Sequence, residues 1–260
     1  MDINHPSLLT LPNHSIHLWH INPQQIKDAN QINYLQTLLS SDEQARVARY
    51  RTPEAQHSAL ITRAFLRLIL SQYVAIQPQD WQFTVSAHGK PEIANSTLPL
   101  RFNLSHNSEL IICSICLNHD IGCDIENVHR KINYTGISKR YFTEPEQRDI
   151  ASQPSLLQGR RFFEYWTLKE AFLKATGYGI SLGLDIVSFT IKSNLKTLIN
   201  DDINIVITDN HKINCNDHWY HCLTYPDQKH CIAISVNTGK DKRVLEIQHF
   251  SAEKLCQLVN

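Results

Sequence analysis

The chain has 260 residues, of which 42% are hydrophobic and 19% charged, with 25 Lys and Arg against 25 Asp and Glu. This composition excludes a disordered chain, which would carry few apolar residues and a large net charge. A formal net charge of zero disfavours a protein that holds nucleic acid or an anionic membrane through bulk positive charge, although it is compatible with a local basic pocket.

No apolar run reaches the roughly 18 residues of a membrane span. The first 25 residues contain no Lys or Arg and no apolar core, so we expect no secretory signal and a cytoplasmic protein. The seven cysteines, an odd number, then predict reduced thiols. Cys113 and Cys116 lie in one predicted strand, where residues three apart face opposite sides, which disfavours a shared zinc ion.

In chain order, the first predicted elements are a strand over 16–21, a short helix after the capping residue Ser40 and a long amphipathic helix over 53–74. Strand candidates follow at 81–85, 101–104 and 110–117. A similar order then recurs, with a strand over 121–126, a short helix after Thr143, a long helix over 159–176, and strands at 186–191, 203–208, 219–224 and 231–236.

Short sequence matches indicate that this order is a duplication. Glu43-Gln44 recurs as Glu146-Gln147, and Ala64–Leu66 recurs as Ala171–Leu173. We therefore predict an α+β fold of two pseudo-symmetric halves, 1–118 and 119–260, each a small antiparallel sheet packed against a long helix, with the active site between them. The alternative is a chance similarity between two amphipathic helices.

Two acidic residues share one face of the strand over 121–126. Asp124 and Glu126 are two residues apart, so their carboxylates point to the same side and repel each other. A hard cation such as Mg²⁺ would relieve this repulsion, which predicts a metal site in the second half. The alternative is a solvated polar face of an edge strand, and on spacing alone that alternative is the stronger one.

The second long helix carries an acid on an apolar face, because Glu170 shares that face with Phe163, Trp166 and Leu173. A carboxylate in such a place is destabilising unless it is paired or bound to a metal. Lys174, one turn later, is one partner, which would make an ordinary salt bridge. The functional interpretation makes Glu170 a metal ligand or general base and directs Lys174 at a phosphate.

Other cations are more ordinary when they are taken singly. Arg46, Lys90 and His106 would each be interpreted as solvated surface residues. Ser105 precedes His106, but adjacent strand residues diverge, so the pair does not indicate nucleophilic catalysis. The sequence contains no phosphate-binding glycine loop of the known kinds.

Four segments taken together resemble one family. They are His88-Gly89-Lys90-Pro91-Glu92, Phe102–His106, Ile121–Glu126 and Trp166–Lys174. In this order and spacing they are similar to the 4'-phosphopantetheinyl transferases of the surfactin-synthetase-activating (Sfp) type, over roughly residues 38–191. The resemblance implies a single chain of two similar α+β halves that binds coenzyme A between them.

The resemblance also implies the reaction and the residues that carry it. The phosphopantetheine arm of coenzyme A would move to a serine of an apo acyl or peptidyl carrier protein, with Mg²⁺ as cofactor and adenosine 3',5'-bisphosphate as the leaving group. By motif, Asp124, Glu126 and Glu170 are the implied Mg²⁺ ligands, and Glu170 and Lys174 the catalytic pair. The implied contacts to coenzyme A are Arg46, Lys90, His106 and Lys174.

Further expectations follow from the same resemblance. The protein would act as a monomer, without nucleic acid or membrane partners, and the carrier would dock near residues 134–150. Asn107 and Cys123 depart from residues that the family often has, and neither change removes an implied ligand. Three alternatives compete: a metal-dependent nuclease, a coenzyme A binding protein without activity, and an α+β protein whose helix carries an ordinary salt bridge.

Overall fold

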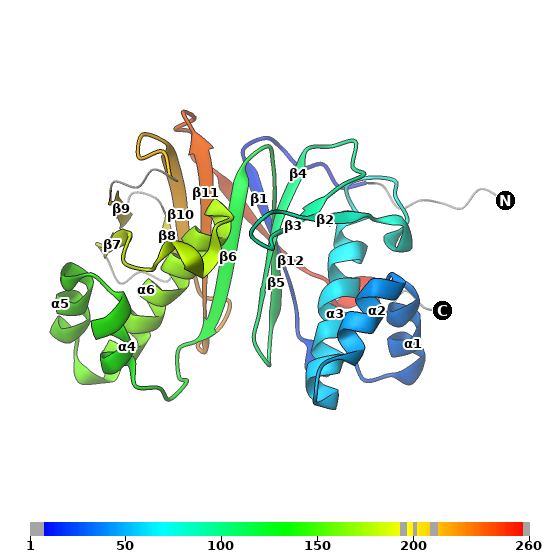
Figure 1. Cartoon of the computed structure of the whole chain (residues 1–260), viewed down its shortest axis with the longest axis horizontal. Helices are drawn as coiled ribbons and strands as arrows, with labels where there is room; N and C mark the ends of the chain where they lie inside the picture. Colours follow the sequence, from blue (N-terminus) through cyan, green and yellow to red (C-terminus); the bar gives the residue numbers. More distant parts are fainter. Residues whose placement is uncertain (1–7, 193–196, 200–201, 209–212, 257–260) are drawn as a thin grey trace.

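The computed structural model describes residues 8–192, 197–199, 202–208 and 213–256. Two four-stranded sheets lie face to face in the middle of the molecule, and helices cover the outer face of each (Figure 1). The layers therefore follow the order helices, sheet, sheet, helices. Within the described residues, no helix is long and apolar enough to cross a membrane.

The first sheet has the strand order β12-β1-β5-β4. Its strands are β12 (Glu246–Ser251), β1 (Ser15–Ile21), β5 (Ile111–Leu117) and β4 (Leu100–His106). The helices on its outer face are α1 (Ala29–Thr37), α2 (Ser41–Ala48) and α3 (Pro53–Leu70), with the short α7 (Glu253–Cys256) beside them. β12 pairs with β1 in parallel, whereas the other pairs are antiparallel.

The second sheet has the strand order β6-β11-β10-β8 and is antiparallel. Its strands are β6 (Asp120–Asn127), β11 (His230–Gly239), β10 (His218–Thr224) and β8 (Thr197–Ile199). The outer helices are α4 (Tyr134–Tyr141), α5 (Glu144–Ser152) and α6 (Ser155–Thr176). Two hairpins lie outside the sheets, β2 (Phe83–Val85) with β3 (Pro91–Ile93) and β7 (Val187–Ile191) with β9 (Ile203–Ile207).

Because successive side chains of a strand point to opposite faces of the sheet, the buried hydrophobic side chains form three cores between the layers. One face of β5 sends Cys113 into the core under α3, whereas the opposite face sends Cys116 into the core between the sheets. β6 contributes Ile121, Cys123 and Ile125 to that same middle core. A third core lies between α6 and the second sheet. The two sheets are therefore held together by apolar packing of their inner faces.

The α+β class and the predicted strands are confirmed, with ends shifted by a residue or two for most of them. The long helix predicted over 53–74 ends earlier, at Leu70, and the one predicted from 159 begins earlier, at Ser155. β12 was not predicted at all. It lies in the same sheet as β1, so the end of the chain returns to the first sheet.

The two short helices α2 and α5 begin with matching hydrogen bonds. Glu43 accepts the backbone N–H of Ser40, and Glu146 accepts that of Thr143, both at 2.9 Å. The next residue in each helix also repeats its contact, since Gln44 donates to Leu39 O and Gln147 to Phe142 O. The sequence predicted both capping residues and both glutamates.

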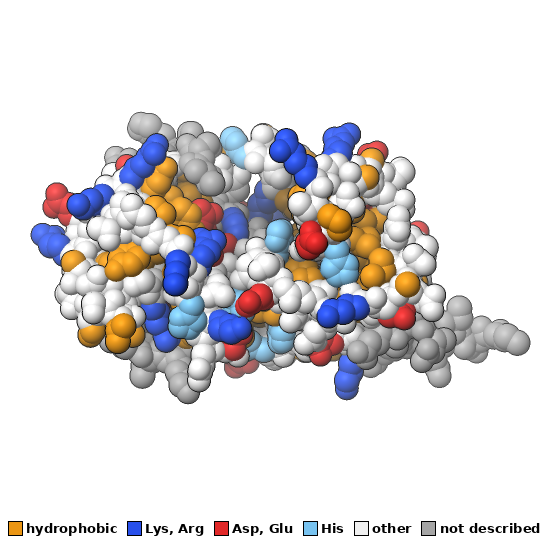
Figure 2. All heavy atoms as spheres, turned by 90° about the horizontal axis from the view of Figure 1, so that it is seen from below, with side chains coloured by type: hydrophobic (Ala, Val, Ile, Leu, Met, Phe, Trp, Pro, Cys, Tyr) orange, Lys and Arg blue, Asp and Glu red, His pale blue; other side chains and the backbone are white. Residues whose placement is uncertain are grey.

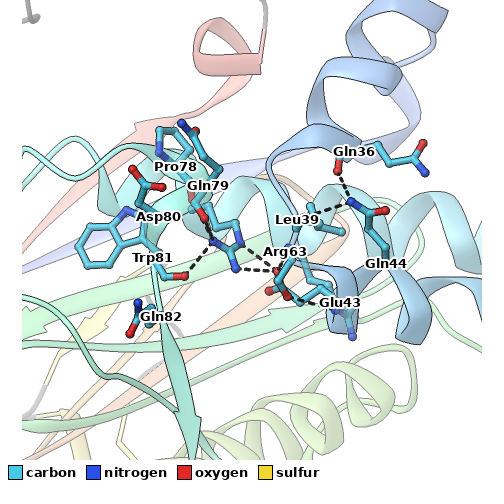
Figure 3. A network of polar contacts seen from close by, with 12 residues as sticks. Gln36, Leu39, Glu43, Gln44, Arg63, Pro78, Gln79, Asp80, Trp81 and Gln82 are labelled. Atoms are coloured by element: carbon cyan, nitrogen blue, oxygen red, sulfur yellow. Dashed lines mark hydrogen bonds and ion pairs between the residues drawn. The ribbon is translucent and has the colours of Figure 1, made fainter.

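Each of these glutamates pairs with a buried cation from the long helix behind it. Arg67 Nη2 lies 2.7 Å from Glu43 Oε2, and Arg67 also donates to the carbonyls of Pro78 and Trp81. Figure 3 labels the acceptors Glu43, Pro78 and Trp81 of this network. Lys169 Nζ lies 2.9 Å from Glu146 Oε2 and donates to the carbonyls of Leu184 and Val187. In both places the cation fixes the chain just before the next hairpin.

Two buried histidines predict acid lability. Burial lowers the pKa of His17 to about 4 and that of His221 to about 3, the neighbouring His218 adding to the effect at His221. The unfolded value is near 6.5. Their contribution to stability is therefore fully present above pH 6.5 and is lost as the pH falls towards these folded values, by about 1.4 kcal/mol per pH unit for each ring.

We expect His221→Gln to flatten the fall in unfolding free energy between pH 6.5 and 4, measured by urea denaturation at several pH values. His88→Gln, on an exposed turn, is the control. Equal slopes for wild type and His221→Gln would contradict the prediction.

Candidate functional site

A pocket of about 290 Å³ lies where the ends of β4 and β6 meet the last turn of α6. Its polar lining comes from Ser105 and His106 on β4, Asp124 and Glu126 on β6, Lys174 on α6, and from Asn107 and Arg130. In the view from below, charged and histidine side chains gather near the middle of the molecule (Figure 2). The pocket thus joins residues that lie up to 70 positions apart in the sequence.

Lys174 and Asp124 form the central contact. Lys174 Nζ lies 2.7 Å from Asp124 Oδ1, which also accepts a hydrogen bond from Ser105 Oγ at 2.8 Å. The sequence offered Glu170 as the partner of Lys174 one turn away on the same helix. Among the described residues, the ion pair of Lys174 is instead with Asp124, so the ordinary salt bridge within the helix does not form.

The carboxylates of this region perturb one another. Burial and, to a smaller extent, the charge of Asp124 together raise the pKa of Glu126 to about 7. Burial also raises the pKa of Glu170, and again Asp124 adds to the effect. Glu126 Oε1 lies 3.3 Å from Arg130, which is its ion-pair partner. Three acids thus share one electrostatic environment, as the spacing of Asp124 and Glu126 predicted for two of them.

His106 faces a basic environment. Burial lowers the pKa of this histidine, and the charges of Lys174 and Arg63 lower it further. The sequence motifs single out neither Arg63 nor Arg130. Neither arginine belongs to a local motif; the fold places Arg130 in the lining of the pocket and Arg63 close enough to His106 to act on its pKa. Both are further candidates for contact with an anionic ligand.

Two of the residues predicted to contact coenzyme A lie outside this pocket. Lys90, in the turn between β2 and β3, donates to Ile121 O at 3.0 Å and to Ala175 O at 3.4 Å, near the opposite end of β6. Arg46 is exposed on α2. Neither residue lines the pocket that contains His106, Asp124, Glu126 and Lys174.

The donor set fits a hard divalent cation. Asp124 Oδ2 is buried without a hydrogen-bond partner, and burial together with the charge of Asp124 raises the pKa values of Glu126 and Glu170. As the described side chains stand, no three acidic, histidine or cysteine groups converge closely enough to hold an ion. The ammonium of Lys174 is bound to Asp124 Oδ1, which leaves Oδ2 as the oxygen of this carboxylate that a cation could use.

Gly122 allows α6 to approach the strand that carries Asp124. A Cβ atom at this position would overlap the backbone oxygen of Ala171 and the backbone nitrogen of Ala175. Backbone atoms cannot move aside, so helix and strand would have to separate. We expect Gly122→Ala to lower the free energy of unfolding by about 2 kcal/mol and to disturb the contact between Lys174 and Asp124.

Urea denaturation checks the first effect. Gly159→Ala is the matched control on α6, because its Cβ would meet Tyr134 at an ordinary 3.9 Å. That control should be neutral or slightly stabilising. A wild-type stability for Gly122→Ala would show that the close approach is not required.

Comparisons with known proteins cover most of the chain. Residues 120–235 match the family model of the 4'-phosphopantetheinyl transferase superfamily, and residues 24–116 match the model of the N-terminal part of 4'-phosphopantetheinyl transferases. The chain is 36% identical over 178 residues to the 4'-phosphopantetheinyl transferase HetI of Nostoc sp., covering 68% of this chain and 74% of that protein. It is 31% identical over 157 residues to the 4'-phosphopantetheinyl transferase Sfp of Bacillus subtilis, covering 60% and 67% respectively.

Proposed function

The chain belongs to the 4'-phosphopantetheinyl transferases of the Sfp type and is an enzyme of the transferase class; from this premise we propose that it moves the phosphopantetheine arm of coenzyme A to a serine of an apo acyl or peptidyl carrier protein. The observation that carries the proposal is the pocket in which Asp124 and Glu126 lie beside Lys174 and His106. Phosphoryl transfer depends on this kind of positioning and charge neutralisation.

Mg²⁺ is the proposed cofactor, held by Asp124, Glu126 and Glu170. The buried, unpartnered Oδ2 of Asp124 and the raised pKa values of the two glutamates support this assignment. When bound, the ion would act as a Lewis acid on phosphoryl oxygens. Contact with the phosphates of coenzyme A is the role proposed for Lys174 and His106, which line the pocket, and for Lys90 and Arg46, which lie outside it.

The proposed step exchanges one phosphorus–oxygen bond for another. The serine oxygen of the carrier bonds to the phosphorus that bears the pantetheine arm, and the bond to the bridging pyrophosphate oxygen breaks. Adenosine 3',5'-bisphosphate leaves with the electron pair of that bond. As the alternative to its role as a ligand, Glu170 is the proposed acceptor of the serine proton, since its raised pKa in the absence of an ion favours proton uptake; Lys174 stabilises charge on the phosphate oxygens.

The direct test is the intact mass of an apo acyl carrier protein, and separately of a peptidyl carrier protein, after incubation with the enzyme, coenzyme A and Mg²⁺. We expect a gain of roughly 340 Da, one phosphopantetheine arm, and none when coenzyme A is omitted. Binding of coenzyme A without modification of either carrier would instead favour a coenzyme A binding protein without activity.

The two halves are proposed to be pseudo-symmetric, with 1–118 and 119–260 as their extents. The repeated contacts of Gln44 and Gln147 with carbonyls five residues earlier support a duplication. Both glutamates also pair with a cation of the long helix, but from positions that are not equivalent, because Arg67 corresponds in the repeat to Lys174 and not to Lys169. Residues 246–256 are an exception, because they pack with the first sheet. The enzyme is further proposed to act as a cytoplasmic monomer.

The carrier is proposed to dock on α4 and α5, over residues 134–150. A pocket there is lined by Tyr134, Lys139, Arg148 and Ile150 among others. Leu156, at the start of α6, is 94% exposed. Exposed basic and apolar side chains together suit an acidic amphipathic helix of a partner.

We expect Arg148→Glu to raise the KM for carrier protein about tenfold, because reversed charge repels an acidic partner, and to leave the KM for coenzyme A unchanged. Steady-state transfer assays with each substrate varied separately measure this. The exposed Arg243→Glu, on the far side of the fold after β11, is the control. A carrier KM equal to that of wild type would move the docking surface elsewhere.

A further inference from the structure

A buried histidine links the turn between β4 and β5 to the second sheet. His230, the first residue of β11, is 3% exposed. Its Nδ1 is hydrogen-bonded to Asp227 Oδ2 at 2.8 Å, and its Nε2 lies 3.2 Å from Glu109 Oε2, without the alignment of a hydrogen bond. Glu109 belongs to the β4–β5 turn and Asp227 to the β10–β11 turn. The imidazole therefore lies between two carboxylates, one from each sheet.

On the side of the first sheet, Glu109 is part of a closed turn. The backbone N–H groups of Glu109 and Leu110 both donate to Asn107 Oδ1 at 2.9 Å, and Asn107 N–H donates to Leu110 O. Asn107 follows His106 directly, and both line the pocket. A displacement of Glu109 is thus passed to the pocket wall that contains His106.

On the side of the second sheet, backbone hydrogen bonds hold His230 in position. Its N–H donates to Asp227 Oδ1 at 2.7 Å, and the neighbouring Lys229 O accepts the N–H of Val128. His230 also pairs with Asn127 in the β6–β11 ladder. β6 is the strand that carries Asp124 and Glu126, so the histidine is anchored to the acidic wall of the pocket.

Along β4 towards its carboxyl end, the last hydrogen bond to β6 is the one that Ser105 donates to Asp124. Beyond it, within the described part of the chain, the next polar link between the two sheets in this direction is the contact of Glu109 with His230. We propose that His230 is a positioning residue that sets the spacing between His106 and the acids Asp124 and Glu126 across the pocket. This inference rests on the proposed function, in which both walls contact one substrate.

The test is His230→Leu, which removes both contacts. The variant should fold, because the side chains of Glu109 and Asp227 are 37% and 48% exposed and water can solvate them. We expect the KM for coenzyme A to rise roughly fivefold, the scale of one lost side-chain hydrogen bond, while kcat and the KM for carrier protein stay within about twofold. His230→Gln, which keeps an amide donor, should recover part of the loss, and Glu109→Ala combined with His230→Leu should be no worse than either change alone.

His218→Leu is the matched control, because His218 lies at the opposite end of the same hairpin and bonds Thr238 Oγ1 at 2.8 Å. Hydrogen exchange at the amides of Glu109 and Leu110 gives a readout that does not depend on activity, and we expect it to accelerate in His230→Leu only. An active wild type with an unchanged KM for coenzyme A in His230→Leu would overturn the positioning role, whatever the exchange rates. An inactive wild type would instead reject the proposed function, and unchanged exchange would then also reject the link itself.

Discussion

Replacing Asp124 by Asn should lower the rate of carrier modification by about 10³-fold, the scale on which loss of a transition-state electrostatic contact acts. The change keeps the size of the side chain and one oxygen acceptor for Ser105. It removes the negative charge that pairs with Lys174 at 2.7 Å and that is proposed to hold the cation. Both the acidic and the basic components of the pocket would therefore be disturbed by a single substitution.

Initial rates of mass gain by the carrier, at saturating coenzyme A and Mg²⁺, measure the effect. Asp120→Asn is the matched control, because Asp120 lies on the same strand but is exposed and pairs with Arg101. Circular dichroism and the unfolding midpoint establish that both variants are folded. If Asp124→Asn kept a tenth or more of the wild-type rate, Asp124 would have no central part in the reaction.

Replacing Lys169 by Met should lower the free energy of unfolding by about 3–5 kcal/mol, because it leaves a buried carboxylate without its cation. Lys169 and Glu146 are both fully buried, and their side chains meet at 2.9 Å. Glu146 also accepts hydrogen bonds from Thr143 and from Phe189 N–H, so it cannot turn to water. The ammonium in turn satisfies the carbonyls of Leu184 and Val187, which lose their donor.

Urea denaturation measures the loss. The slope of the unfolding free energy against urea concentration should equal that of wild type, which shows that unfolding remains two-state. Arg67→Met, which removes the corresponding cation beside Glu43, should be similarly destabilising, since the side chain of Arg67 is 3% exposed. The exposed Arg148→Met on α5 should change stability by no more than about 0.5 kcal/mol. A loss below 1 kcal/mol for Lys169→Met would mean that Glu146 is neutral in the folded protein.

Local sequence signals predicted the framework because they depend on neighbours within a few positions. The capping residues Ser40 and Thr143, with glutamates three positions later, marked both short helices. The alternation in Ile121–Glu126 predicted β6 and placed Asp124 and Glu126 on one face. β12 was missed because Glu246–Ser251 is short and largely exposed, and its pairing with β1 depends on a contact across most of the chain.

The sequence indicated which residues line the candidate site better than it indicated which of them form ion pairs. Four of the selected residues, His106, Asp124, Glu126 and Lys174, line one pocket, which the order of the motifs indicated. The partner of Lys174 is Asp124, 50 positions earlier, and helical spacing could only suggest Glu170. For the same reason, no periodicity could indicate that Lys169, beside Glu170, pairs with Glu146, or that Arg63 acts on His106.

The pairing of β12 with β1 has a consequence for synthesis on the ribosome. Ile16 and Ile247 are partners in the ladder, so the edge of β1 waits for 231 further residues, roughly 10 to 50 s at ordinary translation rates. Ala252 and Cys256 complete the core under α3 only after that interval. Until then the nascent first sheet presents an open strand edge, which is a template for pairing with other chains. The amino-terminal half is thus translated first but completes its sheet and core among the last, and its open edge is the kind of surface that chaperones bind.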